Sequence, residues 1–428
     1  MKKVVFIFLT LFFTASVFAQ AAPAAYEVVL NKFVKFYNAG EADSVFMMFS
    51  PEMKAAEPLD KFTSTTAQLK DQLGTLDQTT FATYTQPIAA YRAKFKNSIF
   101  MLNLALNNDG KITGLFLKPQ DELVAAKTAV DPSVTESTVA VKTLAGSIAG
   151  TLTMPNAATG KVPVVLIISG AGVTDRDGNC KNPLITSNTY QLLAYALGKA
   201  GIASLRYDKR MVGQSVSADK ESQMRFEDYV DDATALISML NDDGRFSKII
   251  IAGHGQGALV GMMSVPDEPI KGFISLEGAG DAADKVLTEQ MKSQPSYLGD
   301  EFKNMLDTLR KGKMTDNIDP ALYYVARPTI QMFLMSWCRY DPQREIKKVK
   351  MPMLIIQGTT DLLYPVTQGL KLKSAKSNAT YSIIRGMNYV LKDAPADREP
   401  NIATYQKPDL PLNKEMVNDV VDFINGLK

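Results

Sequence analysis

Histidine, tryptophan and cysteine are the rarest residues in this sequence. Its 428 residues include one histidine, His254, and two cysteines, Cys180 and Cys338. A single histidine leaves few ligands for a zinc site, so we expect no metal and no cofactor. Two cysteines are too few for a disulfide-based scaffold, although Cys180 and Cys338 could pair in an oxidising compartment.

A surplus of charge of either sign is also missing. The chain has 47 basic and 45 acidic residues. Two of the basic residues, Lys2 and Lys3, lie in an N-terminal segment that we expect to be removed, so the mature chain is formally neutral. That balance implies no broad basic surface for nucleic acid.

Long apolar runs are confined to the N-terminus. Lys2 and Lys3 precede the apolar run 4–17, and Val17-Phe18-Ala19 then offers small residues where signal peptidase cleaves. The pattern predicts a signal peptide over 1–19 and a secreted or periplasmic protein, with later cleavage sites open up to Ala25. No cysteine follows to carry a lipid, and no later apolar run of about 18 residues suggests a membrane span.

The next segment, 24–118, has the pattern of a small α+β domain. Apolar residues at helical spacing predict helices over 26–38, around 43–49 and over 59–73. Alternating residues from Phe100 to Asn107 and the Asp109-Gly110 turn then predict a hairpin with 112–118. Helices followed by an antiparallel sheet make an α+β unit.

The remainder reads as a linker followed by an α/β domain. Prolines and polar residues mark 119–136 as the linker. A hairpin over 138–154 comes next, and strands then alternate with helices, which predicts a mostly parallel sheet with helices on both faces. The helical, methionine-rich stretch at about 281–340 interrupts this alternation and is expected to form a cap. The predicted α/β domain is 137–428.

One turn within this domain has the pattern of a catalytic elbow. An apolar strand, 249–252, runs into Gly253-His254-Gly255-Gln256-Gly257 and then into a helix of small and apolar residues. This is the strand–turn–helix context of the Gly-x-Ser-x-Gly nucleophile elbow. The two glycines of that motif are present, but Gly255 stands at the serine position.

Residues 137–428 resemble the α/β-hydrolase family, in particular its secreted esterase and serine-aminopeptidase-like members. The resemblance rests on segments that occur in the family's order and approximate spacing, namely 168–172, 174–179, 205–210, 253–257, 357–361 and 386–389. It implies the α/β-hydrolase fold. The α+β domain is similar in element order and length to nuclear-transport-factor-2-like domains.

Carried onto this chain, the family's triad of serine, acid and histidine is incomplete. The acid is retained as Asp361, but the nucleophile position is Gly255 and the base position is Tyr389. Glycine cannot attack, and a phenol whose reference pKa is about 10 is a poor base near neutrality. Loss of serine or histidine from such a triad costs on the order of 10⁶ in turnover.

Other residues offer little to refill these roles. His254 directly precedes the elbow, where the resemblance implies a packing role rather than catalysis. Ser264 and Ser169 are two other candidate nucleophiles, but the sequence offers no histidine that is expected to act as a base for either of them. The resemblance implies that the backbone N–H groups of Ala171 and Gln256 are the oxyanion donors, so an oxygen-bearing ligand could still bind.

The remaining polar and aromatic clusters have competing interpretations. The loop 175–177 could bind a cation or a substrate, but we favour a loop held by its own ion pairs, and 206–210 is expected to fix neighbouring loops. The cap residues Met332, Phe333, Met335 and Trp337 either line an apolar pocket or, as we favour, pack in the core.

These observations lead to one principal hypothesis and two alternatives. The principal hypothesis is a secreted α/β-hydrolase-family protein that is catalytically impaired but keeps a pocket for a small-molecule or acyl ligand. The first alternative is an active hydrolase of carboxylic esters or amides with an unrecognised site. The second is a protein-interaction module. The sequence does not give the ligand or the oligomeric state.

Overall fold

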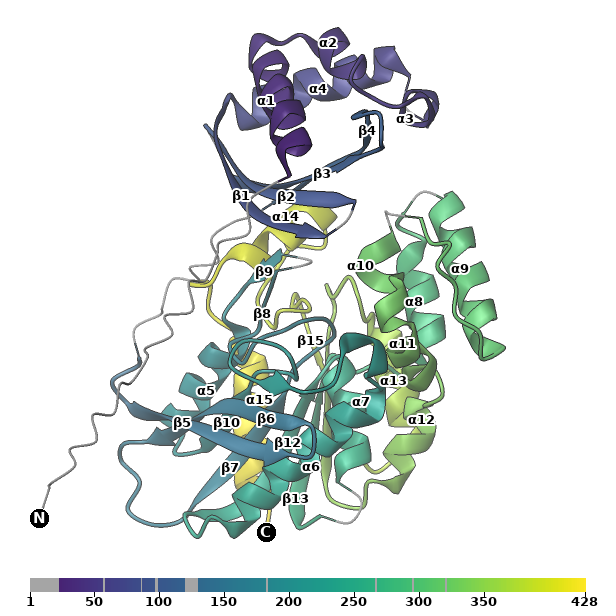
Figure 1. Ribbon diagram of the computed structural model, residues 1–428. Coiled ribbons are helices and arrows are strands. Elements are labelled where there is room, and N and C mark those ends of the chain that lie inside the picture. Colours follow the sequence, from purple (N-terminus) through teal and green to yellow (C-terminus); the bar gives the residue numbers. More distant parts are fainter. Residues whose placement is uncertain are drawn as a thin grey trace, which may run out of the picture. The chain divides into compact units, whose positions relative to one another are not determined.

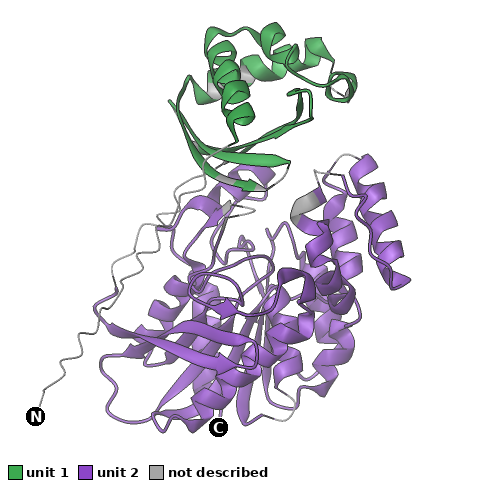
Figure 2. Cartoon of the chain, viewed as in Figure 1, with its two compact units in different colours: residues 1–124 green, residues 125–428 purple. Residues whose placement is uncertain are grey.

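The computed structural model divides the chain into two compact units. It describes residues 23–56, 58–85, 87–96, 99–119, 130–181, 184–265, 268–294, 296–319 and 322–428. Unit 1 is 1–124 and unit 2 is 125–428 (Figure 2). The predicted signal peptide, 1–19, lies outside the described residues. None of the helices in the described part of the chain is long and apolar enough to span a bilayer.

Unit 1 packs helices against one face of an antiparallel sheet (Figure 1). The long helix α1 presents Tyr26, Leu30, Phe33 and Tyr37 to the core, because these residues recur at helical spacing. Gly40 ends α1 in a left-handed conformation. The elements are α1 (Ala24–Ala39), α2 (Ala42–Phe46), α3 (Pro51–Ala56), α4 (Leu59–Leu73), β1 (Leu76–Thr85), β2 (Ile88–Phe95), β3 (Ile99–Leu106) and β4 (Ile112–Pro119).

The sequence patterns missed part of unit 1. Strands β1 and β2 and the short helix α3 were not predicted. Strand β1 is rich in threonine and polar residues, so it shows little apolar alternation, and its pairing with β2 contains two register shifts. These strands are therefore defined by their partners rather than by their own sequence.

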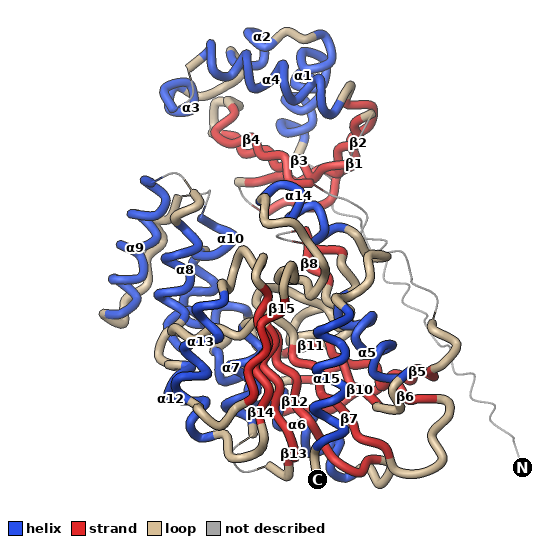
Figure 3. The backbone as a smooth tube through the Cα atoms, turned by 180° about the vertical axis from the view of Figure 1, so that it is seen from behind, coloured by secondary structure: helices blue, strands red, loops and turns tan. Residues whose placement is uncertain are grey.

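Unit 2 is built on one mixed, mostly parallel sheet, seen from behind in Figure 3. Its strand order is β11-β6-β10-β7-β12-β13-β14-β15, with β5 paired to β6. From β10 to β15 the neighbours are parallel, whereas β6 is antiparallel to β5, β10 and β11. The strands are β5 (Val134–Thr143), β6 (Gly146–Pro155), β7 (Val162–Ile168), β10 (Ala203–Tyr207), β11 (Val216–Ser217), β12 (Phe246–His254), β13 (Ile270–Leu276), β14 (Met353–Gly358) and β15 (Thr380–Ile384).

Helices cover both faces of this sheet, as the alternating pattern predicted. One apolar core lies between the sheet and α6 (Phe226–Asp242), α7 (Gln256–Ser264) and the cap helices, and the other lies beneath α5 (Thr189–Lys199) and α15 (Lys414–Gly426). The central strands β7 and β12 read as continuous apolar runs because both of their faces are buried.

Between β13 and β14 the chain forms a group of helices within the stretch predicted as the cap. They are α8 (Ala283–Met291), α9 (Ser296–Arg310), α10 (Tyr323–Ala326) and α11 (Gln331–Trp337). The predicted linker, 119–136, overlaps the last residue of β4 and the first three of β5, and 120–129 lie outside the described residues. The remaining elements of unit 2 are β8 (Asn179–Lys181), β9 (Leu184–Thr186), α12 (Pro342–Glu345), α13 (Val366–Ala375) and α14 (Arg398–Ala403).

Candidate functional site

Gly255 occupies a sharp turn between β12 and α7. Its backbone has φ 52° and ψ −115°, and its N–H donates to the carbonyl of Leu276 at the end of β13. A side chain at positive φ is strained by about 1–3 kcal/mol, and glycine avoids that cost. The turn is therefore the strand–turn–helix elbow that the sequence predicted, with no side chain at its tip.

The two flanking glycines allow the strand and the helix to approach each other closely. A Cβ on Gly253 would lie 2.4 Å from the carbonyl oxygen of Gly257. A Cβ on Gly257 would lie 2.3 Å from the carbonyl oxygen of Ile168 in β7. Both distances are far below contact, so packing alone requires glycine at the two outer positions of the motif.

The side chain of Tyr389 lies against the empty elbow position. A Cβ on Gly255 would be 3.0 Å from the Tyr389 hydroxyl oxygen, and a Cβ on Gly170 would be 2.1 Å from the same oxygen. Tyr389 is 6% exposed, and its ring lies near those of Tyr364 and Tyr405. Burial raises the pKa of Tyr389 well above its ordinary value. A buried neutral phenol therefore lies beside the elbow, between Gly170 and Gly255.

His254, directly before the elbow tip, is held by two hydrogen bonds. Its Nε2 lies 2.8 Å from the backbone carbonyl of Tyr389, which can only accept, so Nε2 carries the proton. Its Nδ1 then accepts from the hydroxyl of Tyr190 at 2.7 Å. Burial lowers the pKa of His254 to about 4. The predicted packing role fits these contacts, which leave neither nitrogen free for catalysis.

Asp361, predicted from the sequence to be the retained acid, lies near a second acid, Glu277. It follows β14, and its Oδ1 accepts from the N–H groups of Leu363 and Tyr364. Glu277 directly follows β13, and its Oε1 accepts from the N–H of Gly358. The two carboxyl groups are close enough for each to shift the pKa of the other. A hydrogen bond between them would require one of them to be protonated.

The electrostatics of this pair agree with a shared proton. Burial raises the pKa of Asp361 to about 7. Burial and the neighbouring Asp361 charge raise the pKa of Glu277 well above its ordinary value. Within the described part of the chain, Asp361 Oδ2 and Glu277 Oε2 have no N–H or hydroxyl partner. Two like charges in such surroundings cannot both be ionised cheaply.

The predicted oxyanion donors lie on the two segments that flank the elbow. Ala171 follows β7, and Gln256 is the first residue of α7. Among the described residues, neither of their backbone N–H groups has a hydrogen-bond partner. The N–H of Gly170 is already used, because it donates to the Tyr190 hydroxyl at 2.8 Å.

The charged loops are held by their own ion pairs, as favoured from the sequence. Arg176 pairs with Asp208, and Arg206 pairs with Asp177 and with Glu136 of β5. The cap aromatics also pack in the core: Phe333 lies against it, and the Trp337 ring stacks on Phe226 in α6. Arg210 binds Asp232 of α6, and Asp175 accepts from the N–H groups of Asp177 and Asn179.

The two serines weighed as nucleophiles are buried. Ser264 donates to the Val260 carbonyl of its own helix, and Ser169 lies beside the elbow with no partner for its hydroxyl among the described residues. Neither is placed against a base. Cys180 and Cys338 do not form a disulfide with each other in the structure, so the possible pairing is not observed.

The cavity beside Gly255 is smaller than the ligand pocket expected from the sequence. It has a volume of about 10 Å³ and is lined by residues that include Gly255, Gln256, Trp337 and Tyr364. That is roughly the room that one water molecule needs. The sequence could not indicate this, because it does not reveal that the Tyr389 and Tyr364 rings lie beside the elbow.

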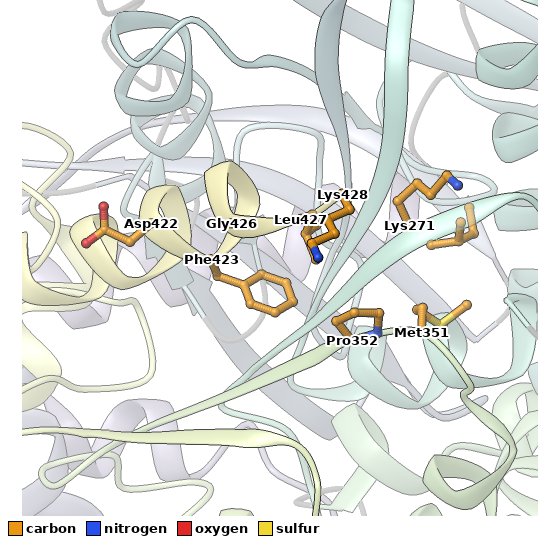
Figure 4. Close-up of a pocket in the computed structure, with 9 residues that line it drawn as sticks. Lys271, Met351, Pro352, Asp422, Phe423, Gly426, Leu427 and Lys428 are labelled. Carbon is orange, nitrogen blue, oxygen red and sulfur yellow. The ribbon is translucent and has the colours of Figure 1, made fainter.

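A larger hollow of about 540 Å³ lies at the opposite end of the sheet, where β13 and β14 begin (Figure 4). It is lined by the C-terminal helix and these strand ends, including Lys271, Met351, Pro352, Phe423 and Leu427. It contains no elbow residue, and its walls are largely apolar.

Sequence reasoning missed Glu277, Tyr190 and Lys209 as parts of the site. Glu277 was assigned to the end of a predicted strand, and its position at the carboxyl edge beside the acid loop was the available signal. Tyr190 gave no signal, since a tyrosine at the start of a helix is usually a packing residue. The contacts of Lys209 join three separate segments of the chain, so the sequence of any one segment could not reveal them.

Two family models match the chain. Residues 185–388 match the family described as serine aminopeptidase, S33, and 31–115 match a family described only as a protein of unknown function. The second match is compatible with the nuclear-transport-factor-2-like domain expected from the sequence. The chain is also 25% identical over 404 residues to Esterase EstD from Thermotoga maritima, covering 90% of this chain and 91% of EstD.

Solved structures of esterases are similar to unit 2 as well. Est1E from Butyrivibrio proteoclasticus, solved with ferulic acid bound, is 17% identical with a TM-score of 0.46, covering 67% of this chain and 99% of Est1E. A Pyrococcus furiosus esterase is 16% identical with a TM-score of 0.45, covering 68% of this chain and 91% of that chain. The match to the serine aminopeptidase family over 185–388 and the similarity to Esterase EstD support an α/β-hydrolase, esterase-like family for this chain, and the elbow and the mostly parallel sheet agree with it.

Proposed function

We propose that this protein is a catalytically impaired member of the esterase-like α/β-hydrolases. The observation that carries the proposal is the absence of a side chain at Gly255, with the buried phenol of Tyr389 against that position. His254, the one histidine in the chain, is neutral and uses both ring nitrogens in other hydrogen bonds. Without nucleophile and base, only roughly 10³–10⁴ over the uncatalysed rate can remain, from oxyanion binding alone.

The polar framework around the vacant position supports loss of catalysis rather than loss of the site's architecture. The free N–H groups of Ala171 and Gln256 would favour a carbonyl or carboxylate oxygen. A ligand oxygen between Gly170 and Gly255 must displace the Tyr389 hydroxyl, which fills that space, and the neighbouring cavity holds only about 10 Å³. We therefore propose that a small acyl compound or carboxylate binds only when Tyr389 moves.

Restoring the two missing groups tests the proposal. The double variant Gly255→Ser/Tyr389→His should hydrolyse short p-nitrophenyl esters, whereas the wild type should not exceed a buffer blank by more than the residual factor above. Gly255→Ser alone should stay inactive, because it lacks a base and its side chain would crowd the Tyr389 ring. Asp361→Asn in the double variant should lower turnover by about 10⁴, the scale for a mis-oriented histidine.

Wild-type turnover that Asp361→Ala abolishes would overturn the proposal and favour the second candidate, an active ester or amide hydrolase. That candidate is supported by the similarity to Esterase EstD, which spans nearly the whole chain. Wild-type turnover that Asp361→Ala leaves unchanged would indicate a contaminating enzyme. A folded but inert double variant would show that position 389 does not correspond to the family's base.

We further propose that the chain is exported to the periplasm or the medium through the signal peptide predicted over 1–19. N-terminal sequencing of the protein recovered from its natural host should begin near Gln20. A mature chain that retains Lys2 and Lys3 would contradict this.

A further inference from the structure

Lys209 is a buried lysine that has no carboxylate partner among the residues that the structure describes. It lies just after β10, is 3% exposed, and places its ammonium group behind the oxyanion loop. Nζ donates to the carbonyls of Gly170 and Gly172 and to the side-chain Oε1 of Gln256. All three acceptors are neutral. Such a charge is costly to bury, so its retention needs a reason beyond packing.

The bond to the Gly170 carbonyl has a consequence for the next residue. The carbonyl of Gly170 and the N–H of Ala171 belong to one planar trans peptide and point in opposite directions. A cation on the carbonyl side therefore turns the N–H to the other side of the loop. It also withdraws electron density through the amide, which strengthens the N–H as a donor, as in chains of polarised hydrogen bonds.

The same loop is fixed from its other side. The N–H of Gly170 donates to Tyr190, which donates to His254, which in turn donates to the Tyr389 carbonyl. Lys209 also binds Gln256, the residue that carries the second predicted donor. One ammonium group thus connects both segments whose free N–H groups flank the elbow.

We propose that Lys209 is a positioning residue that orients and polarises the Gly170–Ala171 peptide, making Ala171 N–H a charge-assisted donor to an oxygen-bearing ligand. The proposal goes beyond the impaired-hydrolase function and does not depend on whether position 255 is catalytic. The titratable groups that act on Lys209 or lie against it come from three elements: Cys180 in β8, Tyr229 in α6 and His254 in β12. Burial lowers the pKa of Lys209 to about 7, which brings its deprotonation into a measurable range.

Selective isotope labelling of the full chain can report this peptide directly. The sequence contains three Gly–Ala pairs, whose alanines are Ala171, Ala258 and Ala279. Labelling glycine carbonyls with ¹³C and alanine nitrogens with ¹⁵N selects the amide signals of these three alanines. The Ala171 amide signal should move with one midpoint between pH 5.5 and 9.5, downfield on the acidic side. Ala258 should not follow it. Ala279 lies two residues after Glu277 and should report the separate titration of the carboxyl pair.

Lys209→Arg is the matched variant, because arginine keeps the cation but does not deprotonate in this range. It should abolish the movement of Ala171 and leave that of Ala279 in place. Cys180→Ser should leave the Ala171 titration intact. If Lys209→Arg does not fold, this variant decides whether the Lys209 ammonium group or the Cys180 thiol causes the titration. An Ala171 signal that does not move in the wild type, that still moves in Lys209→Arg, or that stops moving in Cys180→Ser would overturn the proposal.

Discussion

The neighbouring buried carboxyl groups of Glu277 and Asp361 give the site a pH-dependent stability. Both have pKa values raised in the folded state, mainly by burial. Carboxyl groups with raised pKa values contribute their full stabilisation below their unfolded pKa values, which are near 4. That stabilisation is lost as the pH rises through the pKa of the folded state, which is about 7 for Asp361. The pair therefore opposes stability at alkaline pH.

Glu277→Gln should remove most of this dependence. The glutamine amide can donate to Asp361 Oδ2 without needing a proton, and its oxygen can still accept from the Gly358 N–H. We expect the wild-type melting temperature to fall more steeply between pH 5 and pH 8 than that of Glu277→Gln. Parallel curves, measured by thermal unfolding in matched buffers, would show that the two carboxyl groups do not share a proton. Lys209 and His254 titrate in both proteins, so their contributions cancel in the comparison.

At the scale of residues, the sequence predicted the elbow at Gly255, and the structure has a sharp turn between strand and helix there. The family resemblance also implied Asp361 and Tyr389 as the acid and base positions, and these assignments stay predictions. The small volume of the cavity beside Gly255 could not be predicted from the sequence. It depends on the placement of the Tyr389 and Tyr364 rings, which lie on two loops that are distant in the chain from the elbow.

At the scale of elements, the buried strands and amphipathic helices of unit 2 were the most predictable parts. Strand β10 is a short run of buried residues, and in unit 1 the helix α4 has the predicted bounds, because a helical repeat defines it locally. The edge strand β15 and the helix α13 were missed. Strand β15 alternates weakly and is partly exposed, so its pairing with β14 rather than its own pattern makes it a strand.

The cap is joined to the sheet domain through the start of α6. The N–H of Phe226 donates to the buried hydroxyl of Ser336 in α11 at 2.7 Å, and the Phe226 ring stacks on Trp337. Ser336→Ala would leave a buried N–H unsatisfied, which costs about 1–3 kcal/mol. Urea unfolding followed by Trp337 fluorescence should show a loss of that size.

Ser374→Ala is a suitable control for this loss, because the exposed Ser374 hydroxyl bonds only to the Leu370 carbonyl of its own helix. It should change the free energy of unfolding by no more than about 0.5 kcal/mol. Equal effects of the two substitutions would mean that the Ser336 contact contributes nothing specific to the cap.

At the scale of the whole molecule, the two units have separate apolar cores. The chain's one tryptophan, Trp337, belongs to unit 2, so its fluorescence reports that unit, whereas far-ultraviolet circular dichroism reports both. We predict that Phe33→Ala, in the core of unit 1, shifts part of the dichroism transition and leaves the fluorescence midpoint unchanged. A matching shift of both signals would show that the units unfold as one cooperative structure.

The central claim concerns the whole protein's chemistry, and a fluorophosphonate probe tests it most directly. Such probes form a covalent bond only with a serine that is activated as a nucleophile. Intact-mass measurement after incubation should show no adduct on the wild type and one adduct on Gly255→Ser/Tyr389→His, mapped by peptide sequencing to position 255. A stoichiometric adduct on any serine of the wild-type protein would contradict the account, because it would reveal an active nucleophile in this chain.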